Sequence, residues 1–485
     1  MTDDARGVMM LRMLLPMLLP MLLPKRRPHP ETSPAPGPSL AILARVPLAS
    51  LLVWSLVCLA GAAGAAPRAP GLGRLERRIV ASVDRGTPAA LELLERAVNV
   101  NSGTGNHEGV REVGRMFAAE LDALGFRTQW VDGSAWGRAG HLVAERGGYG
   151  VKVVLVGHLD TVFEPDSPFQ RFQRLDDSTA TGPGVIDMKG GDVIMLLALR
   201  ALRESGVLGA LRVSVVMTGD EEKPGHPLDA ARADLLRAAD GATAAIGFED
   251  GDGELGHAIV ARRGSSGWTL SVHGTPSHSS QVFSSDVGIG AIYEGARLIE
   301  RFRDSLSFEP YLTLNPGLIL GGTAITHELS ASRGTAFGKS NVVAESTIVT
   351  GDLRTLTAEQ RRRAEETMTR IVGEPSPHTE ASIEFDEGYP SLEPTDGNRQ
   401  LLALVDRSSR DLGFGALEPV DPARAGAADV SFLGGHVPMV VDAMGLRGRG
   451  GHTVSETARL GTLAIQAKRV AVTLARMARE SRARR

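Results

Sequence analysis

Short β-branched apolar runs alternate with longer amphipathic stretches over most of this chain. Apolar positions recur with helical spacing at 88–101 and 107–125, and a further helix is predicted at 188–205. The strand-like runs are residues 151–156, 211–217 and 244–248. Runs of this kind are typical of buried parallel strands. The pattern therefore predicts an α/β fold with a mixed, largely parallel sheet.

A different order of elements begins near residue 263. The periodicity predicts a β-α-β-β-α-β unit, with strands at 267–273, 317–321, 345–354 and 381–387 and helices at 288–304 and 358–372. This order is that of a ferredoxin-like α+β unit. We therefore expect a second domain at 263–387, with residues 74–262 before it and 388–485 after it.

Residues 1–66 have the composition of a leader rather than of a packed domain. A repeated Met-Leu-Leu-Pro pattern and a proline-rich run precede Arg45 and an uncharged apolar stretch at 46–66. That stretch ends in small residues, with an A-x-A site at 63–65, which is typical of a secretory signal. The segment at about 45–65 predicts a periplasmic or secreted product. The alternative is an uncleaved membrane anchor, because the run is long enough to span a bilayer.

Composition narrows the classes of function. The 485 residues are enough for two or three domains. The chain has 53 basic and 57 acidic residues, which excludes a global basic footprint for nucleic acid. The single cysteine, Cys58, excludes an intrachain disulfide framework and a cysteine-rich zinc site.

Potential metal ligands follow the three strand-like runs. They are His158, Asp160, Glu221, Glu222 and Glu249, with Asp187 at the start of the intervening helix. Each of these residues alone has a simpler explanation as a loop, surface or helix-capping residue. Together they would share the carboxyl edge of one parallel sheet, where ligands bind. Carboxylates with imidazole suit a divalent cation, zinc above all, at a site without thiolates.

Four motifs extend this pattern. They read GHLDTV at 157–162, GPGVIDMKGG at 182–191, TGDEE at 218–222 and GGHTVSE at 450–456. In order and spacing they resemble the co-catalytic zinc aminoacylase and carboxypeptidase family, over essentially all of 74–480. Its members include bacterial glutamate carboxypeptidases, acetylornithine deacetylase and succinyl-diaminopimelate desuccinylase.

The resemblance implies a site for two divalent ions, zinc in the family. His158 and Glu249 would hold one ion, Glu222 and His452 would hold the other, and Asp187 would bridge both. A water shared by two cations has a lowered pKa, which makes it a nucleophile for amide hydrolysis.

The resemblance also assigns two residues beside the ligands. Asp160 would orient His158 and fix its tautomer. Glu221 would be the general base, taking a proton from water and passing it to the leaving amine.

The resemblance implies that the second domain, 263–387, is an inserted lid that also forms a homodimer. Because the ligand His452 comes after it, the catalytic domain would be discontinuous, formed by 74–262 and 388–485. His278 would reach the active site of the neighbouring subunit, although it could instead be a loop residue bonded to a hydroxyl. Asn341 and Arg354 would hold the carbonyl and carboxylate of the substrate, since a guanidinium fits a carboxylate. Arg354 could also be a surface ion-pair partner.

The expected function is that of an exported dizinc hydrolase cleaving an amide or peptide bond next to a free carboxylate, as a carboxypeptidase or dipeptidase does. The alternative is a deacylase of N-acyl amino acids. A non-catalytic binding protein on this fold should have lost motif residues, and here every motif position is filled. A Rossmann-type nucleotide site is excluded because no G-x-G-x-x-G follows the first strand. Glutamate-releasing members have arginine in the turn that here reads EGYP at 387–390, so the resemblance does not extend to glutamate specificity.

Overall fold

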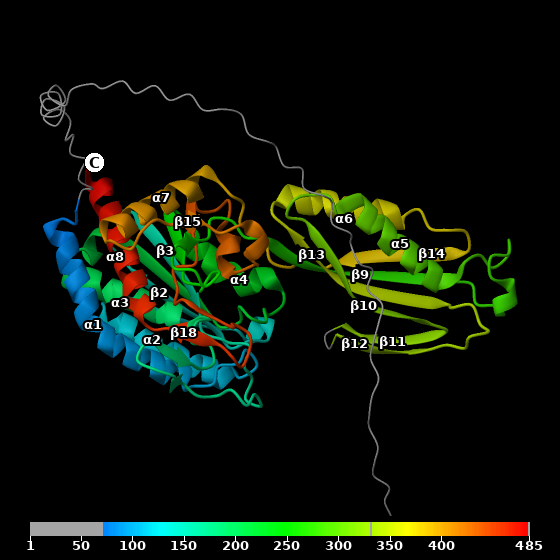
Figure 1. Ribbon diagram of the computed structural model, residues 1–485, viewed down its shortest axis with the longest axis horizontal. Helices are drawn as coiled ribbons and strands as arrows, with labels where there is room; N and C mark the ends of the chain where they lie inside the picture. Colours follow the sequence, from blue (N-terminus) through cyan, green and yellow to red (C-terminus); the bar gives the residue numbers. More distant parts are fainter. Residues whose placement is uncertain (1–70, 330–331, 484–485) are drawn as a thin grey trace, which may run out of the picture. The chain divides into compact units, whose positions relative to one another are not determined.

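Two main sheets, each packed against its own helices, organise the described part of the chain, which comprises residues 71–329 and 332–483 of the computed structural model (Figure 1). Residues from Arg68 onwards form one compact unit. The predicted signal or anchor segment lies outside the described residues. Within them, no helix combines the length and the apolar character needed to cross a bilayer.

The larger sheet has the strand order β1-β2-β6-β3-β7-β16. Its strands are β1 (Arg127–Asp132), β2 (Gly140–Arg146), β3 (Lys152–His158), β6 (Arg212–Thr218), β7 (Ala244–Gly247) and β16 (Met439–Val441). Strand β3 pairs in parallel with both β6 and β7, as the apolar runs predicted. The antiparallel edge pair β1–β2 was not predicted.

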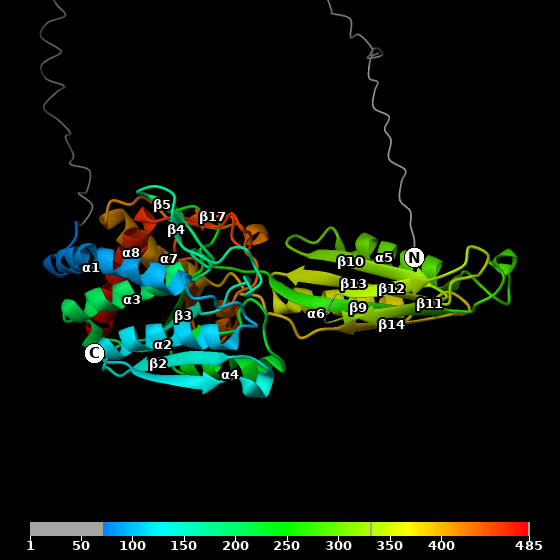
Figure 2. The same ribbon diagram turned by 90° about the horizontal axis from the view of Figure 1, so that it is seen from below.

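Helices cover both faces of this sheet. They are α1 (Arg74–Val98), α2 (His107–Ala123), α3 (Lys189–Glu204), α4 (Leu228–Ala239), α7 (Asp396–Asp411) and α8 (Gly461–Ala483). The helices surround this sheet in Figure 2. Val153 and Leu155 of β3 pack into the core that α1, α2, α3, α7 and α8 share, whereas Val154 and Val156 pack into the core under α4. Both faces of β3 are therefore buried, which explains its continuous apolar run.

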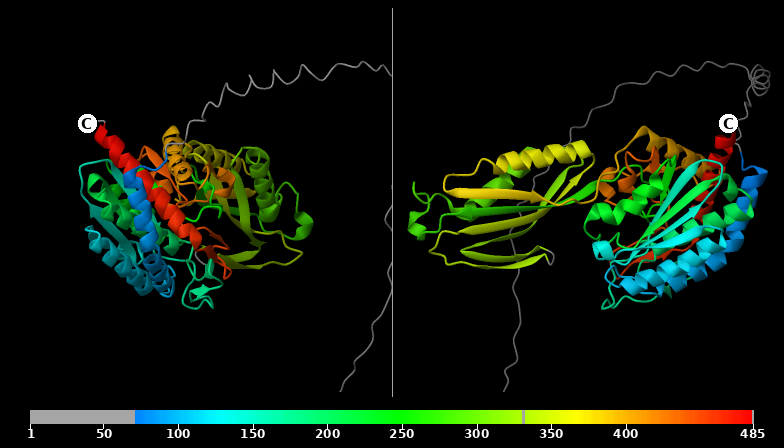
Figure 3. Two further views of the ribbon diagram at one scale, coloured as in Figure 1. Left: turned by 60° about the vertical axis from the view of Figure 1, so that its left-hand side comes forward. Right: turned by 180° about the vertical axis from the view of Figure 1, so that it is seen from behind.

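The prediction that the first helix starts at residue 88 was wrong. Helix α1 begins at Arg74, runs beside α8 and contains Pro88 (Figure 3). Proline removes one backbone hydrogen bond from a helix interior. Ile79 and Val83 before it and Leu94 after it lie on one fully buried face, and packing of such a face supplies most of the stability of a helix in a protein.

The smaller sheet belongs to the lid and has the order β10-β13-β9-β14, all antiparallel. Its elements are β9 (Gly264–Gly274), α5 (Gly290–Leu306), β10 (Thr313–Gly322), β13 (Ser346–Thr355), α6 (Ala358–Val372) and β14 (Thr379–Phe385). Trp268, Phe302 and Met368 lie in its core. The predicted β-α-β-β-α-β order is present, with an additional hairpin, β11 (Ala324–Glu328) and β12 (Arg333–Phe337), that the sequence did not predict.

Short strands bring distant segments together. They are β4 (Gln173–Arg174), β5 (Thr179–Thr181), β8 (His257–Ala258), β15 (Glu418–Pro419), β17 (Gly448–Arg449) and β18 (Thr457–Arg459). Thr457 of β18 pairs with Thr181 of β5. This pairing places the β17–β18 loop, which contains His452, next to the loop that follows β5 and contains Asp187.

Candidate metal centre

The metal ligands expected from the sequence meet at the carboxyl edge of the parallel strands. His158 is the last residue of β3, and the strands on either side of it, β6 and β7, end just before Glu222 and Glu249. His158 Nε2 lies 3.0 Å from Asp187 Oδ1 and 3.6 Å from Glu249 Oε1. The structure therefore groups His158, Glu249 and one oxygen of Asp187.

The other oxygen of Asp187 belongs to a second group. His452 Nε2 lies 2.9 Å from Asp187 Oδ2 and 3.1 Å from Glu222 Oε2. His452 has φ 63°, a left-handed conformation that is uncommon outside glycine and that points to a functional constraint. Asp187 thus lies between two imidazoles and faces each with a different oxygen.

The close approach of these ionisable side chains shifts their pKa values. Burial alone would raise the pKa of Asp187, but hydrogen bonds with His158 and His452 outweigh it and hold this pKa well below its ordinary range. Hydrogen bonds to Asp187 and Glu222 raise the pKa of His452 to about 11. A divalent cation would bind the same carboxylate and imidazole lone pairs that share these protons.

The donor set fits two divalent cations. Ligand atoms of His158, Asp187 and Glu222 all lie within 4.8 Å of one another. Glu222 Oε1 is buried and has no hydrogen-bond partner among the described residues, which is costly for a carboxylate unless a cation binds it. Carboxylate and imidazole donors without thiolate suit zinc and similar ions.

Asp160 is buried directly behind this cluster. Its Oδ1 lies 3.4 Å from His158 Nδ1, and its Oδ2 accepts a hydrogen bond from Thr104 at 2.7 Å. The two oxygens also accept the backbone N–H groups of Glu221 and Glu222, at 3.0 and 3.1 Å. Asp160 therefore contacts His158, as expected, and also holds the loop with the two glutamates, which was not expected.

Glu221 and Glu222 face different surroundings although they are adjacent. Glu222 contacts His452, whereas no described residue forms a hydrogen bond or ion pair with the Glu221 carboxylate. Burial, opposed by His158 and reinforced by the carboxylates of Asp429, Glu222 and Asp187, raises the pKa of Glu221 well above its ordinary value. A carboxylate with a raised pKa and a free lone pair is suited to accept a proton.

A cavity of about 970 Å³ opens beside these glutamates. Glu221, Glu222 and His452 line it together with Arg354 of the lid. Arg354 Nε donates to Asp352 Oδ2 at 2.7 Å, so the ion pair considered from the sequence is present, while Arg354 still borders the cavity.

Two expected lid residues lie elsewhere. His278 and Asn341 are neighbours, because the Ser279 N–H donates to the Asn341 carbonyl at 2.9 Å. Both are exposed, and His278 Nδ1 shares a hydrogen bond with the Ser280 hydroxyl at 2.8 Å. Neither is among the residues that line the cavity of this subunit.

Sequence reasoning missed Glu456, which supports the metal loop. Its carboxylate is fully buried and accepts the backbone N–H groups of Gly184, Ile186 and Asp187 at 3.1, 2.8 and 3.3 Å. Its place four residues after His452, in the last motif, was the available signal.

By contrast, His141 is buried with both ring nitrogens hydrogen-bonded, to Ala231 and Gly219, as expected for a structural histidine.

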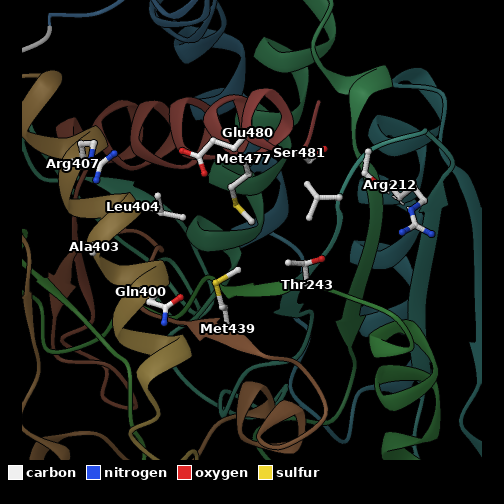
Figure 4. A pocket seen from close by; sticks show the side chains of 12 residues that line it. Arg212, Thr243, Gln400, Ala403, Leu404, Arg407, Met439, Met477, Glu480 and Ser481 are labelled. Atoms are coloured by element: carbon white, nitrogen blue, oxygen red, sulfur yellow. Dashed lines mark hydrogen bonds between the residues drawn. The ribbon is translucent and has the colours of Figure 1, made fainter. Parts of the chain in front are cut away.

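A second cavity, of about 770 Å³, lies at the opposite edge of the sheet (Figure 4). Val151, Arg212, Thr243 and Met439 come from the amino ends of the parallel strands. Side chains of α7 and α8 face each other across it. None of the predicted ligands lines this second cavity.

A family model described as peptidase family M20/M25/M40 matches residues 154–476. The chain belongs to this family. Carboxypeptidase G2 of Pseudomonas sp. (strain RS-16) is 25% identical over 371 residues, covering 76% of this chain and 83% of that protein. The suspected family is thereby confirmed, and the chain is a hydrolase of the metallopeptidase and amidohydrolase type.

Solved structures share the fold of this M20 protein. The aminopeptidase PepT of Bacillus cereus superposes with a TM-score of 0.64 at 19% identity, covering 81% of this chain and 99% of the other. A protein of Bacillus subtilis, described as a dinuclear metal-binding peptidase of the M20 family, gives 0.57 at 14% identity, covering 82% and 99%. The fold class predicted from the sequence is confirmed.

Proposed function

We propose that this M20 protein is a dinuclear zinc hydrolase that cleaves an amide or peptide bond next to a free carboxylate, as a carboxypeptidase or dipeptidase does. The observation that carries the proposal is the position of Asp187 between His158 and His452, beside the unpaired Glu221 carboxylate in a large cavity. These groups could hold two metal ions with a base beside them, which suits amide hydrolysis.

Two zinc ions would be held by the two groups of side chains. His158 and Glu249 would bind one ion, Glu222 and His452 the other, and Asp187 both. When bound, the ions lower the pKa of water and stabilise negative charge that develops on the carbonyl oxygen.

Glu221 would act as general base and then as general acid. Its carboxylate would accept a proton from the attacking water and deliver it to the leaving amine. The carboxylate suits this double role because it lines the cavity and no described residue forms a hydrogen bond or ion pair with it.

Arg354 would recognise the free carboxylate of the substrate. Its Nε is paired with Asp352, and the terminal guanidinium nitrogens form no hydrogen bond with described residues. These nitrogens could bind a carboxylate through two parallel hydrogen bonds. N-acyl amino acids carry the same carboxylate beside the same amide, so deacylation is the competing activity.

A substrate panel with the zinc-reconstituted protein tests the proposal. It contains free-acid dipeptides, their C-terminal amides, folate-like glutamates and N-acetyl amino acids. We expect free-acid dipeptides to be cleaved best. If N-acetyl amino acids are cleaved best, the assigned activity would be deacylase rather than peptidase. If the protein binds two zinc ions but cleaves no member of the panel, the result would favour a non-catalytic binding function.

Arg354→Met refines this test. Loss of charged hydrogen bonds to the carboxylate should raise KM for free-acid dipeptides about 10- to 100-fold. The amidated substrates lack that carboxylate, so their kcat/KM should change little. An equal loss on both kinds of substrate would contradict the assigned role.

Export and dimerisation are part of the same proposal. The apolar stretch before residue 67 supports a cleaved signal, and the lid resemblance supports a homodimer. Amino-terminal sequencing of the product from a bacterial periplasm would test the first, with an intact membrane-bound chain as the anchored alternative. Light scattering during size-exclusion chromatography would test the second.

A further inference from the structure

The two segments that connect the lid to the catalytic domain pair with each other. Ser265, at the start of β9, and Tyr389, after β14, exchange both backbone hydrogen bonds, at 3.0 and 2.7 Å. Arg262 and Leu392 form a second bridge of this kind, at 2.9 and 3.0 Å. The backbone of Tyr389 is therefore fixed within the connection that leaves the lid.

The side chain of Tyr389 reaches from this connection to the loop with the general base. It is 9% exposed, and its ring packs edge to face on Phe432 at 5.0 Å between centroids. Its hydroxyl lies 3.1 Å from the backbone carbonyl oxygen of Glu221 and 3.1 Å from Asp429 Oδ1. The phenol can thus donate to the Glu221 carbonyl, while Asp160 accepts the Glu221 N–H.

A buried charged network holds the phenol in place. Arg232 is fully buried and donates to Asp220 Oδ1, Asp429 Oδ1 and the Tyr389 oxygen at 2.7, 2.8 and 2.5 Å. Asp429 Oδ2 in turn accepts the Thr218 hydroxyl at 2.5 Å. Breaking such a buried network leaves a charge unpaired, so its members keep one geometry.

The phenol remains a donor at ordinary pH. Burial, followed by the carboxylates of Asp429 and Glu221, raises the pKa of Tyr389. The guanidinium of Arg232 donates to the same oxygen, so the single O–H of Tyr389 is shared between the Glu221 carbonyl and Asp429 Oδ1.

We propose that Tyr389 is a positioning residue for Glu221, holding the base from the connection that leaves the lid. This inference rests on the proposed function of Glu221 as the base. Both backbone groups of Glu221 are hydrogen-bonded: Asp160 accepts its N–H, and Tyr389 donates to its carbonyl oxygen. Displacing a catalytic group by a fraction of an ångström is enough to slow proton transfer.

Tyr389→Phe removes the hydroxyl and keeps the ring on Phe432. We expect kcat on a cleaved dipeptide to fall about 10- to 100-fold, as for loss of other supporting contacts in active sites. Tyr389 lines the same cavity as Glu221, but its hydroxyl is bonded to the Glu221 carbonyl and Asp429, so KM should stay within about twofold and both metal ions should remain bound. The matched control is Tyr293→Phe on α5, whose side chain is 59% exposed and which should behave as wild type.

Hydrogen exchange gives a readout that needs no turnover. The amides of residues 219–222 should exchange about fivefold faster in Tyr389→Phe, the change expected for one lost net hydrogen bond, while lid amides stay unchanged. If the wild type is inactive on the panel but exchange accelerates locally, the proposed function fails and the positioning contact stands. Unchanged kcat, or exchange that accelerates uniformly over the protein, would overturn the inference and leave Tyr389 a merely structural residue.

Discussion

The Glu456 carboxylate accepts a hydrogen bond from the backbone N–H of Asp187, at 3.3 Å. The same oxygen accepts the Ile186 N–H at 2.8 Å. The residue that faces both candidate metal positions is thus held by a carboxylate from the far end of the chain. The β5–β18 pairing makes this contact, since Thr181 and Thr457 are partners.

We predict that Glu456→Gln weakens binding of both ions. The amide keeps one acceptor, but its NH₂ group would face backbone N–H donors, which loosens the Asp187 loop. Loss of comparable supporting contacts lowers metal affinity by about 10- to 100-fold. Competition with a chromophoric chelator measures this affinity. Ser455→Ala, at an exposed neighbouring position, is the control and should retain wild-type affinity.

Asp187→Ala should remove both ions after dialysis. Its two oxygens lie beside different imidazoles, so its loss takes a ligand from each group and also the negative charge that offsets repulsion between two dications. Metal stoichiometry by mass spectrometry measures the outcome. Asp229→Ala, on the exposed side of α4, should keep two ions. Two ions retained by Asp187→Ala would disprove the bridging assignment.

Glu221→Gln and Glu222→Gln should have opposite effects on metal content. Glutamine at 221 keeps the shape but cannot accept the proton, so kcat should fall about 10²- to 10⁴-fold with two ions bound. At 222 it replaces a ligand whose Oε2 contacts His452, so an ion should be lost. Metal content and kcat, measured in parallel for both variants, test which glutamate is the base and which is the ligand. The reverse pattern would mean that the roles of these glutamates are exchanged.

The centre of the sheet could be predicted because its signals are local. The β3, β6 and β7 runs are apolar on both faces, and the ligands come directly after them. The edge strand β1 and the hairpin β11–β12 have polar, partly exposed positions, and their pairing is not visible as an apolar run. The helical spacing from residue 88 predicted a late start, whereas helix α1 begins at Arg74 and buries Ile79 and Val83 before Pro88.

The supporting residues of the site could not be predicted in the same way. Glu456 acts through a sheet contact between segments about 275 positions apart. Tyr389 and Arg232 act through a network whose members come from four separate segments. A single sequence shows that these residues are polar or aromatic, but only the packed chain shows which donors and acceptors they satisfy.

The remaining prediction concerns His278 and the proposed homodimer. His278 is exposed on the lid, beside Asn341, and does not line the cavity of its own subunit. A developing oxyanion needs donors in addition to the metal ions, and loss of one donor costs roughly 10²- to 10³-fold in rate. If His278 completes the partner's site, Glu221→Gln and His278→Ala homodimers should both be nearly inactive.

A mixed dimer of these two variants should regain activity. One of its sites would combine Glu221→Gln with His278→Ala, and the other would have both native residues, so up to half of the wild-type activity should return. Subunit exchange between two differently tagged variants, followed by tandem affinity purification, isolates the heterodimer for assay. Glu221→Gln mixed with Tyr293→Phe is the reference for one intact base per dimer. Purified heterodimers without recovered activity would mean that His278 acts within its own subunit or has no part in the reaction.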